Sequence, residues 1–228
     1  FSGALYTSPT ASLPGLKHSF SGLFDAEGPT KLTWASKADP GDPLTLQLQY
    51  PASGQTNVLT GQVSCTNWTA QVQAFPAYSS QSPQAGHYTL WLAKPAADPG
   101  PEGIGVGKVS VSLTGGLALA GKLPDGTAFT QSLRLCQEGR WPFYASLYAG
   151  GGAILGWVEF DGGSSLSGAV GWAKPASPKA KYYRQGLTNV MEVMGLPFIQ
   201  TRRGQRPLNF KRGLAVFSGG GLSTPFTN

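Results

Sequence analysis

The amino-acid sequence predicts an all-β fold, an antiparallel barrel or sandwich with little helix. Of the 228 residues, 32 are Gly and 18 are Pro, and only 12% are charged. This composition is typical of short strands joined by many turns. Segments in which apolar and polar residues alternate recur about every ten residues, whereas helical spacing of apolar residues is rare.

The clearest strand of the first part is Leu44-Thr-Leu-Gln-Leu-Gln-Tyr50. Its alternation places four apolar side chains on one face. Shorter apolar segments on both sides of it predict further strands. The strands predicted for this part of the chain are 1–6, 18–24, 31–35, 44–50, 58–63 and 68–75.

Strand signals continue through the second part, where Leu123-Pro-Asp-Gly126 supplies a hairpin turn. Asp-Gly is a strong hairpin dipeptide because Gly tolerates the positive φ of a tight turn. Segment 188–194 could form a helix or a strand, and its sequence favours a strand. The strands predicted here are 87–93, 108–113, 117–123, 128–135, 142–149, 153–160, 166–172 and 188–194.

A stretch rich in Pro, Ser and Gln, 75–86, predicts a connector between two related β halves. An internal echo supports this division: a strand ends at Cys65 or Cys136, a turn follows, and Trp68 or Trp141 begins the next strand. We therefore divide the chain into a first β half (1–80), a second β half (81–176) and a basic C-terminal segment (177–228) that completes the sheets.

The two cysteines permit one disulfide, between Cys65 and Cys136, without requiring it. If the halves share a topology, the two residues occupy equivalent corners of different halves, which argues against a bond. Two buried thiols are the alternative.

The net charge of +6 is unevenly distributed along the chain. Nine basic residues and one acid, Glu192, follow residue 173, whereas the first 173 residues carry eight basic and ten acidic residues. This asymmetry predicts an anionic partner, such as an anionic polysaccharide; a solvated basic loop is the alternative, and nucleic acid is not expected. The predicted basic patch comprises Lys179, Lys181, Arg184, Arg202, Arg203, Arg206, Lys211 and Arg212.

Residues for catalysis or metal binding are hard to assemble. The two histidines, His18 and His87, have no flanking His, Cys or carboxylate at metal-ligand spacing. Most acidic residues fall in predicted turns, where Asp stabilises the backbone. A glycosidase-like pair of Glu159 with Glu138 or Asp161 is the enzymatic alternative, and otherwise no catalytic residue, metal or cofactor is predicted.

Six tryptophans can fill the core or stack on sugar rings, because indole faces match the apolar C–H faces of carbohydrates. Trp68, Trp91 and Trp157 occupy strand positions and are expected in the core. Trp141 follows a Gly-Arg pair at the edge of a predicted turn, so its ring is the best candidate for exposure. The predicted sugar-contacting residues are Trp141, Tyr144 and Tyr148.

A series of motifs runs from Gly105 to the end of the chain. They are Gly105-Val-Gly-Lys-Val-Ser-Val, Leu119-Ala-Gly-Lys-Leu-Pro-Asp-Gly-Thr-Ala-Phe-Thr-Gln131, Gly139-Arg-Trp-Pro-Phe-Tyr-Ala-Ser-Leu-Tyr148, Gly151-Gly-Ala-Ile-Leu-Gly-Trp157, Trp172-Ala-Lys-Pro175, Leu187-Thr-Asn-Val190 and 218–228. Together they resemble a β-rich repeat module of large secreted surface proteins of Verrucomicrobia and related bacteria. The resemblance spans most of the chain and is strongest over 105–172.

This resemblance implies an extracellular or cell-surface module without enzymatic activity, and it carries over no catalytic residues. The basic segment around Arg202 to Arg206 and the two cysteines depart from the family pattern.

We therefore expect a structural or adhesive module that joins other copies or neighbouring β modules, through strand complementation, in a surface or filamentous assembly. A carbohydrate-binding module using exposed Trp and Tyr, and a glycoside hydrolase or esterase fragment, are the alternatives. The chain has no apolar run long enough to predict a transmembrane helix. It begins at Phe1 without an initiator Met, so we expect a mature form or an excerpt of a longer protein.

Overall fold

A computed structural model of the chain confirms the all-β fold and divides it into two units, Phe1–Phe198 and Ile199–Asn228. Helical structure among the described residues is limited to two short 3-10 turns, η1 (Gln137–Gly139) and η2 (Tyr148–Gly150). The residues that the structure describes are 2–6, 17–24, 30–34, 43–50, 58–95, 102–162, 165–198, 201–202, 204–205, 212–218 and 222–227.

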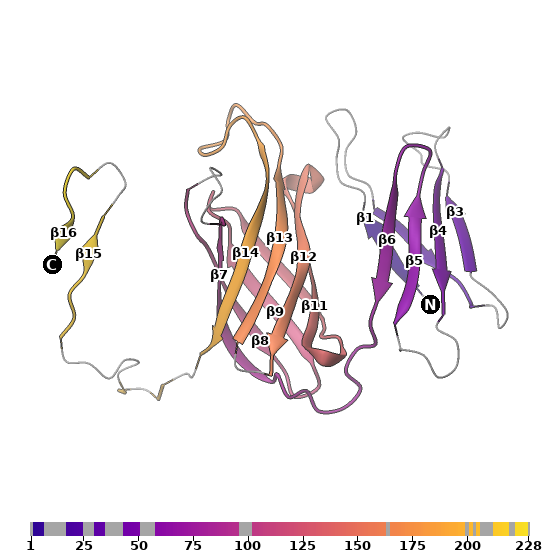
Figure 1. Cartoon of the computed structure of the whole chain (residues 1–228), viewed down its shortest axis with the longest axis horizontal. Helices are drawn as coiled ribbons and strands as arrows, with labels where there is room; N and C mark the ends of the chain where they lie inside the picture. Colours follow the sequence, from indigo (N-terminus) through magenta and orange to yellow (C-terminus); the bar gives the residue numbers. More distant parts are fainter. Residues whose placement is uncertain are drawn as a thin grey trace. The chain divides into compact units, whose positions relative to one another are not determined.

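An eight-stranded antiparallel sheet forms a nearly closed barrel (Figure 1). Its strands are β7 (Gly86–Ala93), β8 (Gly105–Val111), β9 (Gly116–Lys122), β10 (Ala128–Arg134), β11 (Arg140–Leu147), β12 (Gly152–Asp161), β13 (Ser165–Lys174) and β14 (Leu187–Pro197). Neighbours in the sheet are neighbours in sequence, and β14 returns to pair with β7. Only β10 and β11, consecutive along the chain, share no backbone ladder.

Side chains bridge the seam between β10 and β11. Gln131 donates from Nε2 to the carbonyl oxygen of Pro142 over 2.8 Å, and Trp141 donates from Nε1 to Gln131 Oε1 over 2.9 Å. Pro142 has no N–H group and cannot donate to a ladder, so it is tolerated at this edge position. The Gln131 amide therefore provides hydrogen bonds where the two edge strands do not pair.

Apolar side chains fill the interior of the barrel. Alternation along each strand sends every second side chain inward, as in β11, where Trp141, Phe143, Ala145 and Leu147 are buried. An eight-stranded barrel is just wide enough for side chains to fill it. The largest side chains with less than 2% exposure include Trp141, Trp172, Phe143, Leu90, Leu92, Leu117, Leu135, Ile154, Leu166 and Met191.

A separate four-stranded meander precedes the barrel in sequence. Its strands, in sheet order, are β3 (Thr30–Trp34), β4 (Leu44–Gln49), β5 (Leu59–Ser64) and β6 (Thr69–Ala74). The alternation predicted for 44–50 is confirmed, since Leu44, Leu46 and Leu48 are buried, although Tyr50 lies beyond the strand and is exposed. Phe20 and Val72 pack against this small core.

Two short hairpins complete the described strands. The first pairs β1 (Ser2–Tyr6) with β2 (Lys17–Ser21), and Phe20 of β2 contributes to the core of the four-stranded sheet. In the second unit, β15 (Val216–Phe217) pairs with β16 (Phe226–Thr227). The described part of the chain contains no helix with the length and hydropathy that a membrane crossing requires.

The predicted connector 75–86 lies between β6 and β7 and packs against the barrel. Ala77 forms an isolated bridge with Cys136, and the amide of Tyr78 donates to the carbonyl oxygen of Leu135 over 3.0 Å. The buried Ser82 and Gln84 side chains hydrogen-bond each other over 3.0 Å. The strand predicted at 188–194 is also confirmed and belongs to the longer β14.

Glycines on β13 provide a test of how closely the strands approach. A Cβ at Gly168 would lie 2.2 Å from the Trp157 carbonyl oxygen, whereas a Cβ at Gly171 would meet only the Leu155 carbonyl oxygen, at 3.8 Å. We expect Gly168→Ala to destabilise the fold by about 1–3 kcal/mol because backbone must move. Gly171→Ala, the matched control, should lie within about 0.5 kcal/mol of wild type in urea unfolding. Equal losses of stability in the two variants would contradict the close approach of β13 to the Trp157 carbonyl group at Gly168.

Candidate functional site

Four connections meet at one end of the barrel. Because antiparallel strands alternate in direction, every second connection lies at the same end, which groups the β7–β8, β9–β10, β11–β12 and β13–β14 connections. Each contributes to a set of contacts that we call the loop network. The loop network consists of Glu102, Asp125, Tyr148, Trp172, Lys174 and Tyr183.

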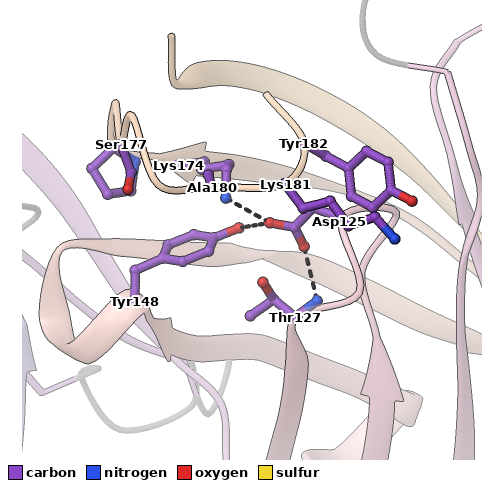
Figure 2. A pocket seen from close by; sticks show the side chains of 9 residues that line it. Asp125, Thr127, Tyr148, Lys174, Ser177, Ala180, Lys181 and Tyr182 are labelled. Atoms are coloured by element: carbon purple, nitrogen blue, oxygen red, sulfur yellow. Dashed lines mark hydrogen bonds and ion pairs between the residues drawn. The ribbon is translucent and has the colours of Figure 1, made fainter. Parts of the chain in front are cut away.

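The carboxylate of Asp125 is the centre of the loop network (Figure 2). The Thr127 amide donates to Oδ1 over 2.9 Å, as expected for Asp in a hairpin turn. The Tyr148 hydroxyl and Lys174 Nζ both donate to Oδ2 over 2.8 Å. Burial by itself would raise the pKa of Asp125, but the hydrogen bonds from Lys174, Thr127 and Tyr148 outweigh it and hold the pKa below its usual range.

Lys174 and Asp125 form a buried ion pair. Their side chains are only 7% and 3% exposed, respectively. Lys174 Nζ also lies 4.3 Å from the centre of the Tyr148 ring, which adds a cation–π contact. A buried charge is tolerated only when it is paired and hydrogen-bonded, and both requirements are met here.

Tyr148 and Tyr183 extend the network to the remaining connections. Trp172 Nε1 donates to the Tyr148 hydroxyl over 3.0 Å, and the ring of Tyr183 packs edge-on against Trp172. The Tyr183 hydroxyl donates to the carbonyl oxygen of Glu102. Burial, reinforced by the hydrogen bond to Asp125, raises the pKa of the Tyr148 hydroxyl far above that of a free tyrosine.

Both tyrosines have left-handed backbone conformations, with φ of 52° at each. This conformation is unfavourable for residues other than glycine and costs about 1 kcal/mol or more. The hydrogen bonds of the two hydroxyl groups hold each residue in place against that cost.

An open depression of about 400 Å³ lies beside the loop network (Figure 2). Asp125, Tyr148 and Lys174 border it together with Lys181 and Tyr182. The carboxylate, the phenol and the ammonium group of the network already bond one another, so they act mainly to join the connections. Among the described residues, every buried side-chain nitrogen or oxygen has a hydrogen-bond partner.

The predicted exposure of Trp141 is wrong. Its side chain is 0% exposed and lies inside the barrel, because β11 already begins at Arg140 and alternation turns residue 141 inward. Tyr144 occupies the opposite face of β11, and Tyr148 lies beyond the strand with its hydroxyl in the loop network. The three residues therefore do not form one platform for a sugar ring.

The prediction that Trp68, Trp91 and Trp157 fill the core is also wrong for two of them. Trp68 and Trp157 are 42% and 40% exposed, and Trp91 is half-buried. The exposed ring of Trp157 packs edge-on against Phe75, with 5.4 Å between the ring centres. Arg140 covers the Phe75 ring at 4.6 Å, so the end of the connector is attached to the outside of the barrel.

Two carboxylates of the enzymatic alternative, those of Glu138 and Glu159, belong to exposed ion pairs, and Asp161 is exposed at the end of β12. Arg140 Nε lies 3.8 Å from Glu138 Oε2 and 3.7 Å from Glu159 Oε1. Both glutamates are mostly exposed, and such surface pairs contribute little to stability. Within the described ranges no group of three or more His, Cys, Asp or Glu side chains could hold a metal ion.

The residues of the predicted basic patch are distributed over both units. Lys179, Lys181 and Arg184 are exposed on the β13–β14 connection of the first unit. Arg202 and Arg212 are exposed in the second unit. Arg203, Arg206 and Lys211 lie outside the described residues.

The structure holds both cysteines as free thiols. Cys65 follows β5 and is half-buried, whereas Cys136 follows β10 and is buried. Burial raises the pKa of the Cys136 thiol, and the nearby Arg140 opposes this only in part. The disulfide that the sequence left open is therefore not formed here.

Comparisons with models of known families, with curated proteins and with solved structures find no match for this chain. The geometry of the loop network is the strongest guide to function.

Sequence reasoning missed this network, and it proposed only one of the members, Tyr148, as a site residue, for contact with a sugar. Asp125, Tyr148, Trp172 and Lys174 all belong to the motifs on which the family resemblance was based. The available signal was the up-and-down order of the predicted strands, which places their connections at one end. Tyr183 lies outside those motifs and carried no comparable signal.

Removing Lys174 tests the buried ion pair. We expect Lys174→Met to destabilise the fold by about 3–5 kcal/mol, because it leaves the Asp125 carboxylate buried and unpaired. Asp125→Asn combined with Lys174→Met should recover much of this loss, since no buried charge remains. Urea unfolding measures both, with Lys108→Met, at an exposed lysine of β8, as the control. A loss no larger than that of the control would contradict the pair.

Acid unfolding tests the same carboxylate. The folded-state pKa of Asp125 is depressed, so its stabilisation is present above the unfolded-state pKa and is lost as the pH falls through the folded-state pKa. From about pH 4 downward, the free energy of unfolding should therefore fall more steeply for wild type than for Asp125→Asn. Parallel curves for the two proteins would disprove the assignment.

Proposed function

We propose that this chain is a non-catalytic structural or adhesive module of an extracellular or cell-surface assembly, and that it joins other copies or neighbouring β modules. One observation carries the proposal: the motif residues Asp125, Tyr148, Trp172 and Lys174 converge on a single network whose polar groups bond one another. Motif residues that bond one another in this way stabilise the fold itself, as expected for a structural module.

The chemistry of the network supports this function over catalysis. A general base must reach a substrate proton, but the Asp125 carboxylate is 3% exposed and already accepts three hydrogen bonds. A nucleophilic lysine or tyrosine would need a free lone pair, whereas Lys174 is ion-paired and the Tyr148 pKa is raised. Using these groups for chemistry would first require the connections to separate.

Exposed apolar side chains support a role in assembly. In the second unit, the tilted rings of Phe217 and Phe226 lie with their centres 6.1 Å apart, on a hairpin whose strands have two residues each. A two-stranded hairpin is marginally stable by itself. Its apolar side chains Leu214, Val216, Phe217, Leu222 and Phe226 are 52–74% exposed. Such a segment gains stability when a partner covers it.

The exposed basic side chains of the β13–β14 connection support an anionic polysaccharide as an additional partner. Lys179, Lys181 and Arg184 lie close together in sequence on this connection. A surface polysaccharide with carboxylate groups would offer the complementary charge.

Sedimentation velocity over a concentration series tests the proposed assembly. We expect reversible self-association as the chain concentration rises towards the millimolar range, with monomer restored on dilution. Reversibility separates assembly from aggregation. A chain that remains strictly monomeric throughout the series would refute the assembly role.

A further inference from the structure

One edge of the four-stranded sheet, β6, has no partner strand in the part of the chain that the structure describes. Strand β6 pairs with β5 over all six of its residues, from Thr69 to Ala74, and no other described strand pairs with it. Figure 1 shows β6 as the last strand on one side of this sheet. Five of its six residues are exposed, and Val72 is half-buried. An edge of this kind presents unpaired N–H and C=O groups to another chain.

The β6 edge lacks the usual protection against pairing. Natural edge strands are commonly blocked by charged side chains, Pro or a bulge. The sequence of β6, Thr-Ala-Gln-Val-Gln-Ala, contains no charge and no Pro, and its register with β5 has no interruption. The opposite edge, β3, carries the exposed Lys31. Of the two described edges of this sheet, β6 is therefore the one suited to accept a neutral strand.

The sequence of β6 has a two-fold pattern. Residues Ala70-Gln-Val-Gln-Ala74 form a palindrome centred on Val72. If two copies of β6 pair antiparallel about a two-fold axis at Val72, Ala70 faces Ala74, Gln71 faces Gln73, and Val72 faces Val72 of the other copy. An interface between identical subunits must be self-complementary in this way.

The rows of side chains across the sheet would continue in the same pairing. Gln47, Gln62 and Gln71 form one row over β4, β5 and β6, and Gln62 Nε2 donates to Gln47 Oε1 over 2.8 Å. Antiparallel pairing centred on Val72 extends this row with Gln73 of the second copy. On the other face, the row of Leu48, Gly61 and Val72 meets the second Val72. Polar residues thus meet polar ones and apolar residues meet apolar ones.

We infer that two copies of this chain associate through antiparallel pairing of their β6 edges, which joins two four-stranded sheets into one eight-stranded sheet. This inference rests on the proposed assembly role and identifies the surface and the symmetry through which it acts. The ladder is short and buries little area, so the pairing is weak by itself. It becomes effective where many copies are held close together.

Two double variants test the register. Gln71→Lys with Gln73→Lys places two pairs of like charges opposite each other across the two-fold axis, and should raise the dimer Kd by roughly tenfold or more. Gln71→Lys with Gln73→Glu carries the same number of new charges but places Lys opposite Glu, and should dimerise as wild type does. Sedimentation velocity gives the Kd values, and circular dichroism verifies that each variant is folded.

The outcomes separate this inference from the proposed function. Weakened association of the Lys/Lys variant, with association retained in the Lys/Glu variant, supports β6 pairing. Unchanged association of the Lys/Lys variant would overturn β6 pairing and leave the assembly role intact, through another surface. Equal loss in both folded variants would overturn the two-fold register. A wild-type chain that never associates would overturn the inference and the assembly role together.

Discussion

The buried pair of Asp125 and Lys174 governs the organisation of one end of the barrel. Two charges removed from water are stable only if each finds the other and their remaining hydrogen-bonding groups are also used. Asp125 meets this condition through a turn amide and a phenol, and Lys174 meets it through the face of an aromatic ring. Because the partners come from different connections, satisfying one charge fixes the relative positions of three pairs of strands.

Adjacent strands of the barrel are joined in two different ways. Around most of its circumference, adjacent strands are joined by backbone ladders. At the seam, where β10 and β11 share no ladder, the side chains of Gln131 and Trp141 replace the missing bonds. Trp141 joins this seam to the apolar interior, since its ring is buried while its N–H group serves the polar contact. Trp141 thus contributes both to the apolar core and to the hydrogen bonds at the seam.

Much of the fold could be predicted because alternation with a period of two is a direct consequence of strand geometry. The segment 44–50 shows this, as does the assignment of 188–194 to a strand. Strand ends are set by hydrogen bonds that the pattern does not encode. The exposure predicted for Trp141 was wrong for this reason. Strand β11 begins one residue before it, at Arg140, so Trp141 belongs to the strand and lies on the same inward face as Phe143.

The candidate site was harder to predict than the fold. Asp125, Tyr148 and Lys174 are separated by more than twenty residues from one another, and each has an ordinary local explanation in a turn or at a strand end. Their contact depends on which connections share an end of the barrel, a property of the whole topology. The exposed Trp157 was missed for a related reason, since a second apolar surface on the outside of the barrel receives Phe75.

The pairing of β14 with β7 has a consequence for how the chain reaches its native state. About a hundred residues separate the partners of this ladder, such as Trp91 and Met194. Closing so long a loop has a large entropic cost, and we therefore expect this ladder to form late. While the chain is being synthesised, β7–β10 and β11–β13 can form only two separate meanders, because β14 is the strand that joins them, and β7 and β13 each lack a neighbour. These meanders remain exposed to wrong strand pairing until residue 197 becomes available. A chain that ends before β14, through early termination or proteolysis, would thus be an aggregation-prone fragment with exposed strand edges and not a smaller barrel.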